Sequence, residues 1–405
     1  MLIRYIFLTS LVGLTLRASS SLRGENDGRE CDSIASLETP EIKHEADTTP
    51  LSVCNLTGSA NAEPGHVFEG VEKRIELFFD VPDKDPMGLR ALTRSALDTV
   101  CSASKCTIIH DEHRECFDSY ILSESSLFVF RDRVMIKTCG TTLPLGGVPA
   151  IITEARKLGL QATEMTYSRG SFLFPELQLF PHTDLESEFE YLRSFQMDEE
   201  GLNDAGESCL VGNREGSYWL VHKKRFGQGP SRAQKKVMVD CIMTGLSDEA
   251  RARYFKDESF SDSENEAVMA TSLEQIEPSF VIKGKCFDPC GYSCNAHGSL
   301  PFDERYFTVH ITPEKDFSYA SVEAVFDTSP QLDAETIQSF VQRVAGVFMP
   351  ENIKVTVLSP EGFRVKEQLE FPGFAYRKTS EDELTFSSPY ASKASSVVFT
   401  KQIGH

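Results

Sequence analysis

Residues 120–145 read YILSESSLFVFRDRVMIKTCGTTLPL, and this stretch predicts a β-hairpin. Its two apolar runs, 127–130 and 134–136, are rich in the aromatic and β-branched side chains that favour strands. The charged pair Arg131-Asp132 between the runs suits a tight turn. Strands joined by such a short turn lie antiparallel, so the stretch favours a fold built on antiparallel sheets.

The open end of this hairpin carries a hydroxyl and a thiol. A two-residue turn would place Ser125 opposite Thr138, with Glu124 opposite the residue after it. A three-residue turn would instead place Ser125 opposite Cys139. Directly opposed Cβ atoms lie roughly 4.5–5.5 Å apart, so either register brings the two groups together. From the residues alone, a polar strand end, a phosphorylation site and a small buried cysteine stay open as simpler interpretations.

Beyond the hairpin, predicted strands outnumber predicted helices, and short turns join several of them. We expect two short strands within 108–137 and others at 67–79, 217–222, 279–282, 306–312, 319–326 and 353–357. We expect helices at 88–103, 148–158, 186–195, 235–244 and 332–347, and an acidic loop at 257–266. This pattern predicts the α+β class with mainly antiparallel sheets.

Composition and charge limit the classes of function. The chain has 405 residues, a formal net charge of −20 and 40% hydrophobic residues, which is enough for a real core. An acidic chain of this kind lacks the basic face of a nucleic-acid binder, so we expect no nucleic-acid partner. The sequence has no uninterrupted apolar run of about 18 residues, so no membrane span is expected.

The N-terminal residues 1–65 read as an extension that precedes the folded part, 66–405. Arg4 stands before the apolar stretch 5–16, and small residues follow at 18–20, as in a signal peptide. The remainder of the extension is rich in Ser, Glu and Asp and has little periodicity. A targeting role and an unstructured extension both stay open.

The chain has 11 cysteines, an odd number spread over a long sequence, which favours reduced thiols in a cytosolic enzyme. Cys286, Cys290, Cys294 and His297 lie close together with the spacing C-x₃-C-x₃-C-x₂-H. A proline and a glycine between them exclude a single helix, and the C-x₂-C pair of common zinc sites is missing. We therefore expect no metal.

Several ordered motifs share one resemblance. They are LSESS at 122–126, KTCGTT at 137–142, FEGVEK at 68–73, FDPCGYS at 287–293, and HITPE with FSY at 310–319. In sequence, order and spacing they resemble the eukaryotic S-adenosylmethionine decarboxylases, a family of pyruvoyl-dependent enzymes that are made as proenzymes. The resemblance covers residues 67–400.

The resemblance implies a four-layer αββα sandwich with two stacked antiparallel sheets. It also implies that the chain cuts itself between Glu124 and Ser125, through attack of the Ser125 hydroxyl on the preceding carbonyl, followed by elimination and hydrolysis. The products would be a small β chain, 66–124, and a large α chain, 125–405, which begins with a covalent pyruvoyl group. This pyruvate cofactor would form a Schiff base with the substrate amine and act as an electron sink.

The implied reaction converts S-adenosylmethionine into CO2 and decarboxylated S-adenosylmethionine, the aminopropyl donor for spermidine and spermine. The implied partners are this small molecule and the two chains of one precursor. The resemblance favours the cytoplasm, and the sequence leaves open whether the enzyme forms a homodimer.

Catalytic and processing roles carry over one residue at a time. His310 resembles the base that drives elimination, and Ser293 the residue that assists processing through a hydrogen bond. Cys139 resembles the acid that protonates the α-carbon after decarboxylation. Glu69 and Glu72 belong to the N-terminal motif, and we expect both in the catalytic site, with Glu69 near the pyruvoyl group.

Substrate contacts are implied in the same way. Phe68 and Phe287 match two rings that sandwich the adenine. Glu314 matches a carboxylate that binds both ribose hydroxyls, which suits its two acceptor oxygens. Leu122 would contribute backbone contacts to the adenine edge.

Some relatives are activated by putrescine, which binds at buried acids that correspond to Glu76, Asp240 and Glu323. Another of these acids aligns with Lys236. We therefore expect Lys236 to supply a built-in ammonium in this site, against the alternative that it is a solvated helix residue.

The sequence also suggests two other functions, a catalytically dead paralogue and a secreted binding protein. A catalytically dead paralogue should have lost the processing serine or its helpers, but all of them are present here. A secreted, disulfide-containing binding protein, suggested by the N-terminus together with Cys31 and Cys54, would risk oxidising the thiol that the reaction needs. An active decarboxylase is therefore favoured.

Overall fold

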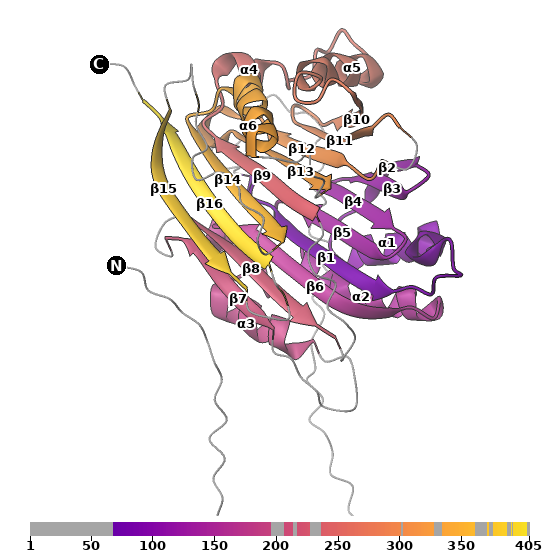
Figure 1. Ribbon diagram of the computed structural model, residues 1–405. Coiled ribbons are helices and arrows are strands. Elements are labelled where there is room, and N and C mark those ends of the chain that lie inside the picture. The colour runs from indigo at the N-terminus through magenta and orange to yellow at the C-terminus, as the bar shows by residue number, and fades with distance from the viewer. Residues whose placement is uncertain are drawn as a thin grey trace, which may run out of the picture. The chain divides into compact units, whose positions relative to one another are not determined.

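Two eight-stranded antiparallel sheets, one from each half of the chain, form the centre of the structure (Figure 1). The computed structural model describes residues 68–195, 206–213, 217–226, 236–300, 303–327, 334–360, 371, 376–386, 390 and 392–402, all within one compact unit, 57–405. The first sheet contains β1 (Lys73–Asp80), β2 (Ile108–His113), β3 (Phe117–Leu122), β4 (Ser125–Phe130), β5 (Arg133–Thr138), β6 (Gln161–Gly170), β7 (Glu207–Gly212) and β8 (Tyr218–Arg225). The second contains β9 (Lys236–Thr244), β10 (Phe280–Cys286), β11 (Tyr292–Gly298), β12 (Tyr306–Thr312), β13 (Tyr319–Asp327), β14 (Asn352–Pro360), β15 (Tyr376–Thr385) and β16 (Ser392–Lys401).

Both sheets have the same strand order. The first runs β2-β3-β4-β5-β1-β6-β8-β7, and the second runs β10-β11-β12-β13-β9-β14-β16-β15. Each strand of the second sheet therefore has an equivalent in the first, so that β9 corresponds to β1 and β13 to β5. This agreement supports an internal duplication of the fold.

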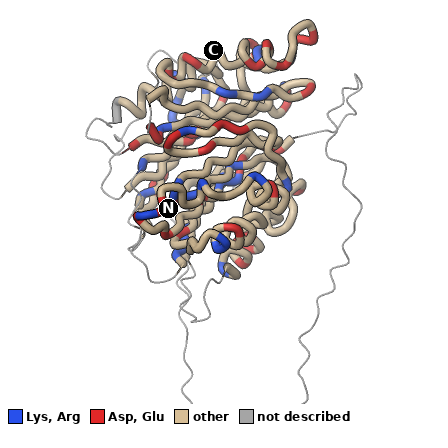
Figure 2. The backbone as a smooth tube through the Cα atoms, turned by 90° about the vertical axis from the view of Figure 1, so that its right-hand side faces the viewer, with Lys and Arg blue, Asp and Glu red and all other residues tan. Residues whose placement is uncertain are grey.

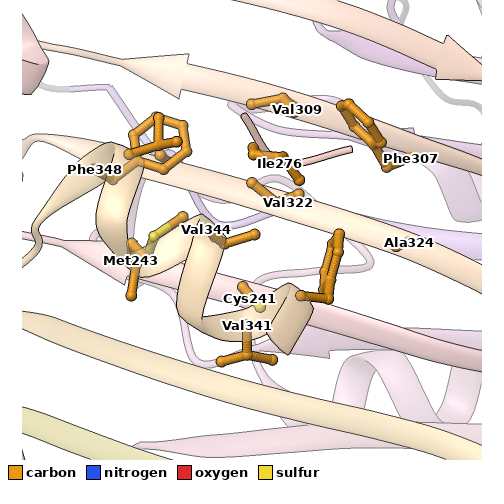
Figure 3. Close-up of a cluster of buried hydrophobic side chains, with 14 of the residues drawn as sticks. Cys241, Met243, Ile276, Phe307, Val309, Val322, Ala324, Val341, Val344 and Phe348 are labelled. Carbon is orange, nitrogen blue, oxygen red and sulfur yellow. The ribbon is translucent and has the colours of Figure 1, made fainter. Parts of the chain in front are cut away.

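Helices cover the outer face of each sheet. The first carries α1 (Arg94–Ala103), α2 (Pro144–Lys157) and α3 (Leu185–Ser194), and the second carries α4 (Asp248–Ala252), α5 (Asp262–Leu273) and α6 (Ala334–Phe348). Three short 3₁₀ helices are η1 (Gly88–Ala91), η2 (Pro175–Leu177) and η3 (Lys315–Phe317). Figure 3 shows Val341 and Val344 of α6 beside Cys241 and Met243 of β9, all fully buried. Each such aliphatic side chain contributes about 1.5–3 kcal/mol on burial.

The inner faces of the two sheets pack against each other. Phe128 of β4 stacks on Tyr306 of β12, with the ring centroids 4.2 Å apart. Acidic and basic side chains also meet in this layer, where Arg74 of β1 lies 2.8 Å from Glu323 of β13. Figure 2 marks the acidic and basic positions along the backbone. The order of layers is thus helix, sheet, sheet, helix, and the predicted four-layer α+β sandwich is confirmed.

The hairpin of β4 and β5 has the two-residue turn. Val129 pairs with Val134 and Ser125 with Thr138, so the register is the first of the two that the sequence allowed. The prediction of only two strands in this region was wrong, because residues 108–138 form four strands, β2 to β5.

The predicted helix at 235–244 is wrong, because this segment is strand β9. Val237, Val239 and Cys241 point to the outer core, whereas Met238 faces the layer between the sheets. This period of two is typical of a strand buried on both faces, and its valines favour that conformation.

Other boundaries differ because of local capping. The predicted acidic loop at 257–266 contains the start of α5, where Ser261 and Glu264 form a reciprocal capping box. Helix α2 begins at Pro144, which suits the first turn of a helix. The sequence missed β6, β7, β11, β15 and β16. No described helix is long and apolar enough to span a membrane.

Candidate active site

Ser125 occupies a strained position at the start of β4. It pairs with Leu122 across the two-residue turn formed by Ser123 and Glu124, and its side chain is buried. Its φ of 118° lies in a region that side chains other than glycine rarely adopt. Such strain costs about 1–3 kcal/mol and persists only where the surrounding structure enforces it. The Glu124–Ser125 peptide is therefore held in an unusual conformation.

Cys139 faces this serine from the neighbouring strand. Its Sγ lies 3.4 Å from Ser125 Oγ, and its backbone N–H donates to the Glu124 carbonyl at 3.2 Å. The thiol is buried, and burial, with the nearby Glu124 and Glu72 carboxyls, raises its pKa well above the ordinary value. The thiol thus keeps its proton in contact with the hydroxyl, and the predicted juxtaposition is confirmed.

Glu124 places a carboxyl group beside the same thiol. Its Oε2 lies 3.9 Å from Cys139 Sγ, and burial raises its pKa to about 7. Gly140 has a φ of 62°, and a Cβ at this position would lie 3.3 Å from the Glu124 carboxyl and from the Phe68 ring. A glycine here lets these groups approach closely.

Glu69 is buried where the chain enters the fold. Its carboxylate accepts backbone N–H bonds from Val71 at 2.9 Å and Phe174 at 2.7 Å, yet burial raises its pKa above the ordinary value. Its carbonyl accepts a bond from Gly140 N–H at 2.8 Å, next to Cys139. The N-terminal motif therefore lies against the Ser125–Cys139 pair.

His310 lies in a buried network with Glu72. Its Nδ1 is 2.9 Å from Glu72, and its Nε2 is 2.9 Å from Ser126 Oγ. Tyr319 and Ser321 also donate hydroxyl bonds to Glu72. Burial lowers the pKa of His310, so the imidazole is neutral near pH 7. For Glu72, burial alone would raise the pKa, but Lys137 and His310 together lower it to about 2.

Two predicted processing residues, Ser293 and His310, lie close together, but the hydrogen bonds of His310 differ from those expected of a base for Ser125. Ser293 of β11 pairs with His310 of β12 in the second sheet. The hydrogen bonds of His310, however, lead to Ser126 and Thr308, not to the Ser125 hydroxyl. The base role of His310 stays a prediction, and Ser126, which the sequence analysis missed, joins the site.

The four predicted substrate residues are all among the described residues. Phe68 and Phe287 are half-buried, and Leu122 is fully buried beside Ser125. One carboxylate oxygen of Glu314 is buried without a hydrogen-bond partner among the described residues. A buried acceptor in this state fits a ligand that supplies hydroxyl donors.

The predicted acids for a diamine, Glu76, Asp240 and Glu323, meet between the sheets, and we call them the acid cluster. Arg74 lies 3.1 Å from Glu76 and 2.8 Å from Glu323. Lys137 lies 3.2 Å from Asp240 and 3.1 Å from Glu323. Arg133 lies 3.4 Å from Glu76 as well, so the described residues supply three buried cations to this cluster.

The prediction that Lys236 supplies the built-in ammonium chose the wrong residue. Its Nζ lies 2.6 Å from Glu304 and 3.1 Å from Asp327, both of which are partly exposed. Lys236 pairs with Asp327 at the end of the β9–β13 ladder, whereas Asp240 pairs with Glu323 further along. Arg74 and Lys137, which the sequence analysis missed, occupy the expected place.

The suggested zinc ligands lie on β10, on β11 and in the loop between them. His297 contacts Glu112 at 3.0 Å, and Cys286 contacts the Asp262 carbonyl. Among the described residues, no cluster of three or more His, Cys, Asp or Glu side chains is arranged to hold a metal ion.

Comparisons with known proteins agree on one family. Residues 65–391 match the family model described as adenosylmethionine decarboxylase. The S-adenosylmethionine decarboxylase proenzyme of Catharanthus roseus is 38% identical over 297 residues, which cover 72% of this chain and 79% of the relative. The proenzyme of Caenorhabditis elegans is 35% identical over 326 residues, which cover 78% and 84%.

Among solved structures, a crystal structure of the Trypanosoma brucei AdoMetDC-delta26 monomer is similar, with a TM-score of 0.48 and 23% sequence identity. The match covers 68% of this chain and 99% of that one.

Proposed function

Because this chain belongs to the S-adenosylmethionine decarboxylase family, we propose that it cuts itself at Ser125 and then releases the carboxyl group of S-adenosylmethionine as CO2. The product is the aminopropyl donor for spermidine and spermine. The observation that carries the proposal is the strained Ser125, whose hydroxyl lies against the Cys139 thiol within the matched motif.

The strained peptide supports the processing step. The Ser125 hydroxyl adds to the Glu124 carbonyl carbon, the peptide C–N bond breaks, and an ester joins the two residues. Loss of the Ser125 α-proton then breaks the ester C–O bond and leaves Glu124 with a free carboxylate. Water replaces the remaining nitrogen, which departs as ammonia. Relief of the Ser125 strain favours the forward direction.

His310 is the proposed base for the α-proton. Its imidazole is neutral near pH 7 because burial lowers its pKa, so Nε2 can accept a proton. Glu72 at Nδ1 orients the ring and stabilises the charge that forms on it. Ser126 lies between Nε2 and the processing site, and we propose that it positions the imidazole there.

The residues around Ser125 fit a pyruvoyl group at this position, since the backbone is already strained and a protonated thiol lies beside it. The pyruvoyl group made from Ser125 would supply a ketone that binds the substrate amine and draws electrons from the breaking C–C bond. Cys139 then delivers a proton to the α-carbon. Glu69 accepts the Gly140 N–H with its backbone carbonyl, and burial raises the pKa of its carboxyl group. Its proposed role is to keep a polar group beside the loop that carries Cys139.

Phe68, Phe287 and Glu314 are the proposed contacts for the nucleoside. Stacking of a base on an aromatic ring contributes about 1–3 kcal/mol, and such rings also favour the sulfonium cation. The Glu314 oxygen that has no hydrogen-bond partner among the described residues supports its role as the acceptor of the ribose hydroxyls. Backbone groups at Leu122, beside Ser125, would complete the adenine site.

The activity itself is tested with S-adenosylmethionine labelled in its carboxyl group. The purified protein should release labelled CO2, and treatment with a carbonyl-reducing agent in the presence of substrate should stop the release. Absence of release from a fully cut protein would contradict the proposed function.

We expect Glu314→Gln to raise KM for S-adenosylmethionine by roughly 10- to 100-fold, because hydrogen bonds to charged groups contribute about 1.5–3 kcal/mol. Steady-state kinetics would measure this change. The control is Asp316→Asn, an exposed acid two residues further on, which should leave KM within about twofold. Equal KM values for the two variants would refute the ribose role.

Putrescine should change the activity by less than about twofold. Arg74 and Lys137 already lie within salt-bridge distance of all three residues of the acid cluster, so a diamine would have to displace a protein cation. The measurement is the rate of CO2 release with and without millimolar putrescine. Several-fold activation would show that putrescine can bind at the acid cluster beside the protein cations.

We also propose that the enzyme works in the cytoplasm. The nine cysteines among the described residues are all free thiols, which supports a reducing compartment. Fractionation of cells that express the whole chain, followed by blotting for the large chain, would test this location. Recovery in a membrane-enclosed fraction would instead support a targeting role for the N-terminal extension.

A further inference from the structure

Lys73 is a fully buried lysine that contacts the loop after Cys139. It is the first residue of β1, and it points to the outer face of the first sheet, away from the acid cluster. Its ammonium donates to the Gly140 carbonyl at 2.9 Å and to Gln178 Oε1 at 2.8 Å. Gly140 directly follows the thiol residue, so this bond fixes the Gly140–Thr141 peptide, one residue beyond Cys139.

The charges near Lys73 belong to the active site. The groups that raise its pKa against the lowering effect of burial include Cys139, Glu188 and Glu69, and the net pKa is about 8. In return, Lys73 lowers the pKa of Glu124 and of Cys139 against the raising effect of burial. One ammonium therefore interacts with the thiol and with the Glu69 and Glu124 carboxyl groups.

Other buried residues hold the Lys73 side chain in place. Its Nζ lies 5.3 Å from the centre of the Phe172 ring, and Arg169 lies 4.2 Å from the same ring. Arg169 is anchored in turn by Glu188, with bonds of 2.6–2.9 Å, and Glu188 also accepts bonds from Tyr167 and His182. These contacts keep the Lys73 ammonium within hydrogen-bond distance of the Gly140 carbonyl.

We propose that Lys73 is a positioning residue for Cys139: it fixes the Gly140–Thr141 peptide that follows the thiol residue and supplies the positive charge that keeps the thiol able to exchange its proton. The inference deepens the proposed function, because Cys139 must give up a proton in every turnover. A buried thiol without a nearby cation would hold its proton too strongly. The Glu124 carboxylate formed by processing would add negative charge here, which makes the cation more necessary.

The direct test measures the thiol in the uncut Ser125→Ala chain, so it does not depend on processing or activity. Iodoacetamide alkylates thiolates, and the rate at Cys139 can be followed by peptide mass between about pH 6.5 and 7.5, below the Lys73 pKa of about 8, where its ammonium is still charged. Lys73→Met in this background should slow alkylation of Cys139 about tenfold, which corresponds to one pH unit, the lower end of the effect of a neighbouring charge. Lys73→Arg, which keeps the charge, should restore most of the rate.

Lys224→Met is the matched control. Lys224 is also a buried lysine on the outer face of the first sheet, and it also donates to backbone carbonyls, those of Leu192 and Arg193. This variant should alkylate at the rate of the background chain. If Lys73→Met and Lys224→Met have the same effect on Cys139, or if neither has any, the proposal is wrong.

A second measurement uses the cut enzyme. Lys73→Gln in the otherwise unchanged protein should lower kcat at least tenfold and leave KM within about threefold, because Lys73 acts through the thiol and not on the substrate. A rise in KM with unchanged kcat would overturn the positioning role. Failure of the wild type to release CO2 would count against the proposed function and would leave the alkylation result valid.

Discussion

Ser125→Ala should remain one full-length chain and release no CO2 from S-adenosylmethionine. The change removes the only hydroxyl that can attack the Glu124 carbonyl from within the same residue, and without the ester no pyruvoyl group can form. Alanine also keeps the strained backbone position, where the φ of 118° would persist without relief. Denaturing gels and intact mass would detect the uncut chain, and a labelled-CO2 assay its inactivity.

Ser126→Ala is the matched control for this prediction. It removes a neighbouring hydroxyl, one that binds His310 at 2.9 Å and Asn295 at 2.7 Å, but it leaves the nucleophile in place. We expect this variant to be cut more slowly but completely. If Ser126→Ala stayed uncut while Ser125→Ala was cut, the nucleophile would have been assigned to the wrong serine.

Lys137→Met should lower the free energy of unfolding by about 3–5 kcal/mol, the usual cost of removing one partner from a buried ion pair. Lys137 is almost completely buried, and it lies 3.2 Å from Asp240 and 3.1 Å from Glu323, which are buried as well. Its loss removes the described cation that contacts Asp240, because Arg74 contacts Glu76 and Glu323 and Arg133 contacts Glu76. Urea unfolding of the uncut Ser125→Ala chain would measure the change without the complication of two chains.

Lys236→Met serves as the control, because it was the cation that the sequence analysis preferred. Its side chain is 19% exposed and its partners Glu304 and Asp327 are 39% and 55% exposed. Ion pairs at such positions contribute about 0–1 kcal/mol. A larger loss for Lys236→Met than for Lys137→Met would reverse the assignment of the buried cations.

Much of the site could be predicted because its chemistry is local in the sequence. The apolar runs around Arg131-Asp132 determine the hairpin, and the hairpin brings Ser125 and Cys139 together. The short motifs then identify the residues that approach from other strands. The strand predictions at 306–312 and 319–326 were also confirmed, because both segments are rich in the β-branched and aromatic residues that favour strands.

The errors come from contacts that no local pattern contains. Arg74 and Glu323 are 249 residues apart, and they meet only because two sheets stack face to face. For the same reason, the sequence did not indicate that His310 would bind Ser126. A charged residue inside an apolar strand, as Lys137 is in β5, was the available signal for a buried ion pair.

Segment 235–244 shows how a period of two can be mistaken for a helix. Its apolar residues fill both faces of β9, so the contrast between faces that marks a half-buried strand is weak. The expectation for Lys236 came from its alignment with an acid of the relatives, and this alignment did not show which acids Lys236 would face. On the strand, Lys236 and Asp240 lie on the same face but four positions apart, and each pairs with a different acid of β13.

The intact mass of the purified wild-type protein tests the central claim most directly. The account predicts two chains: a smaller one that ends at Glu124, and a larger one that covers 125–405 and is lighter by one ammonia than a chain beginning with serine. That mass would show that Ser125 has become a pyruvoyl group. A single uncut chain, or a large chain that still begins with an intact serine, would contradict the account.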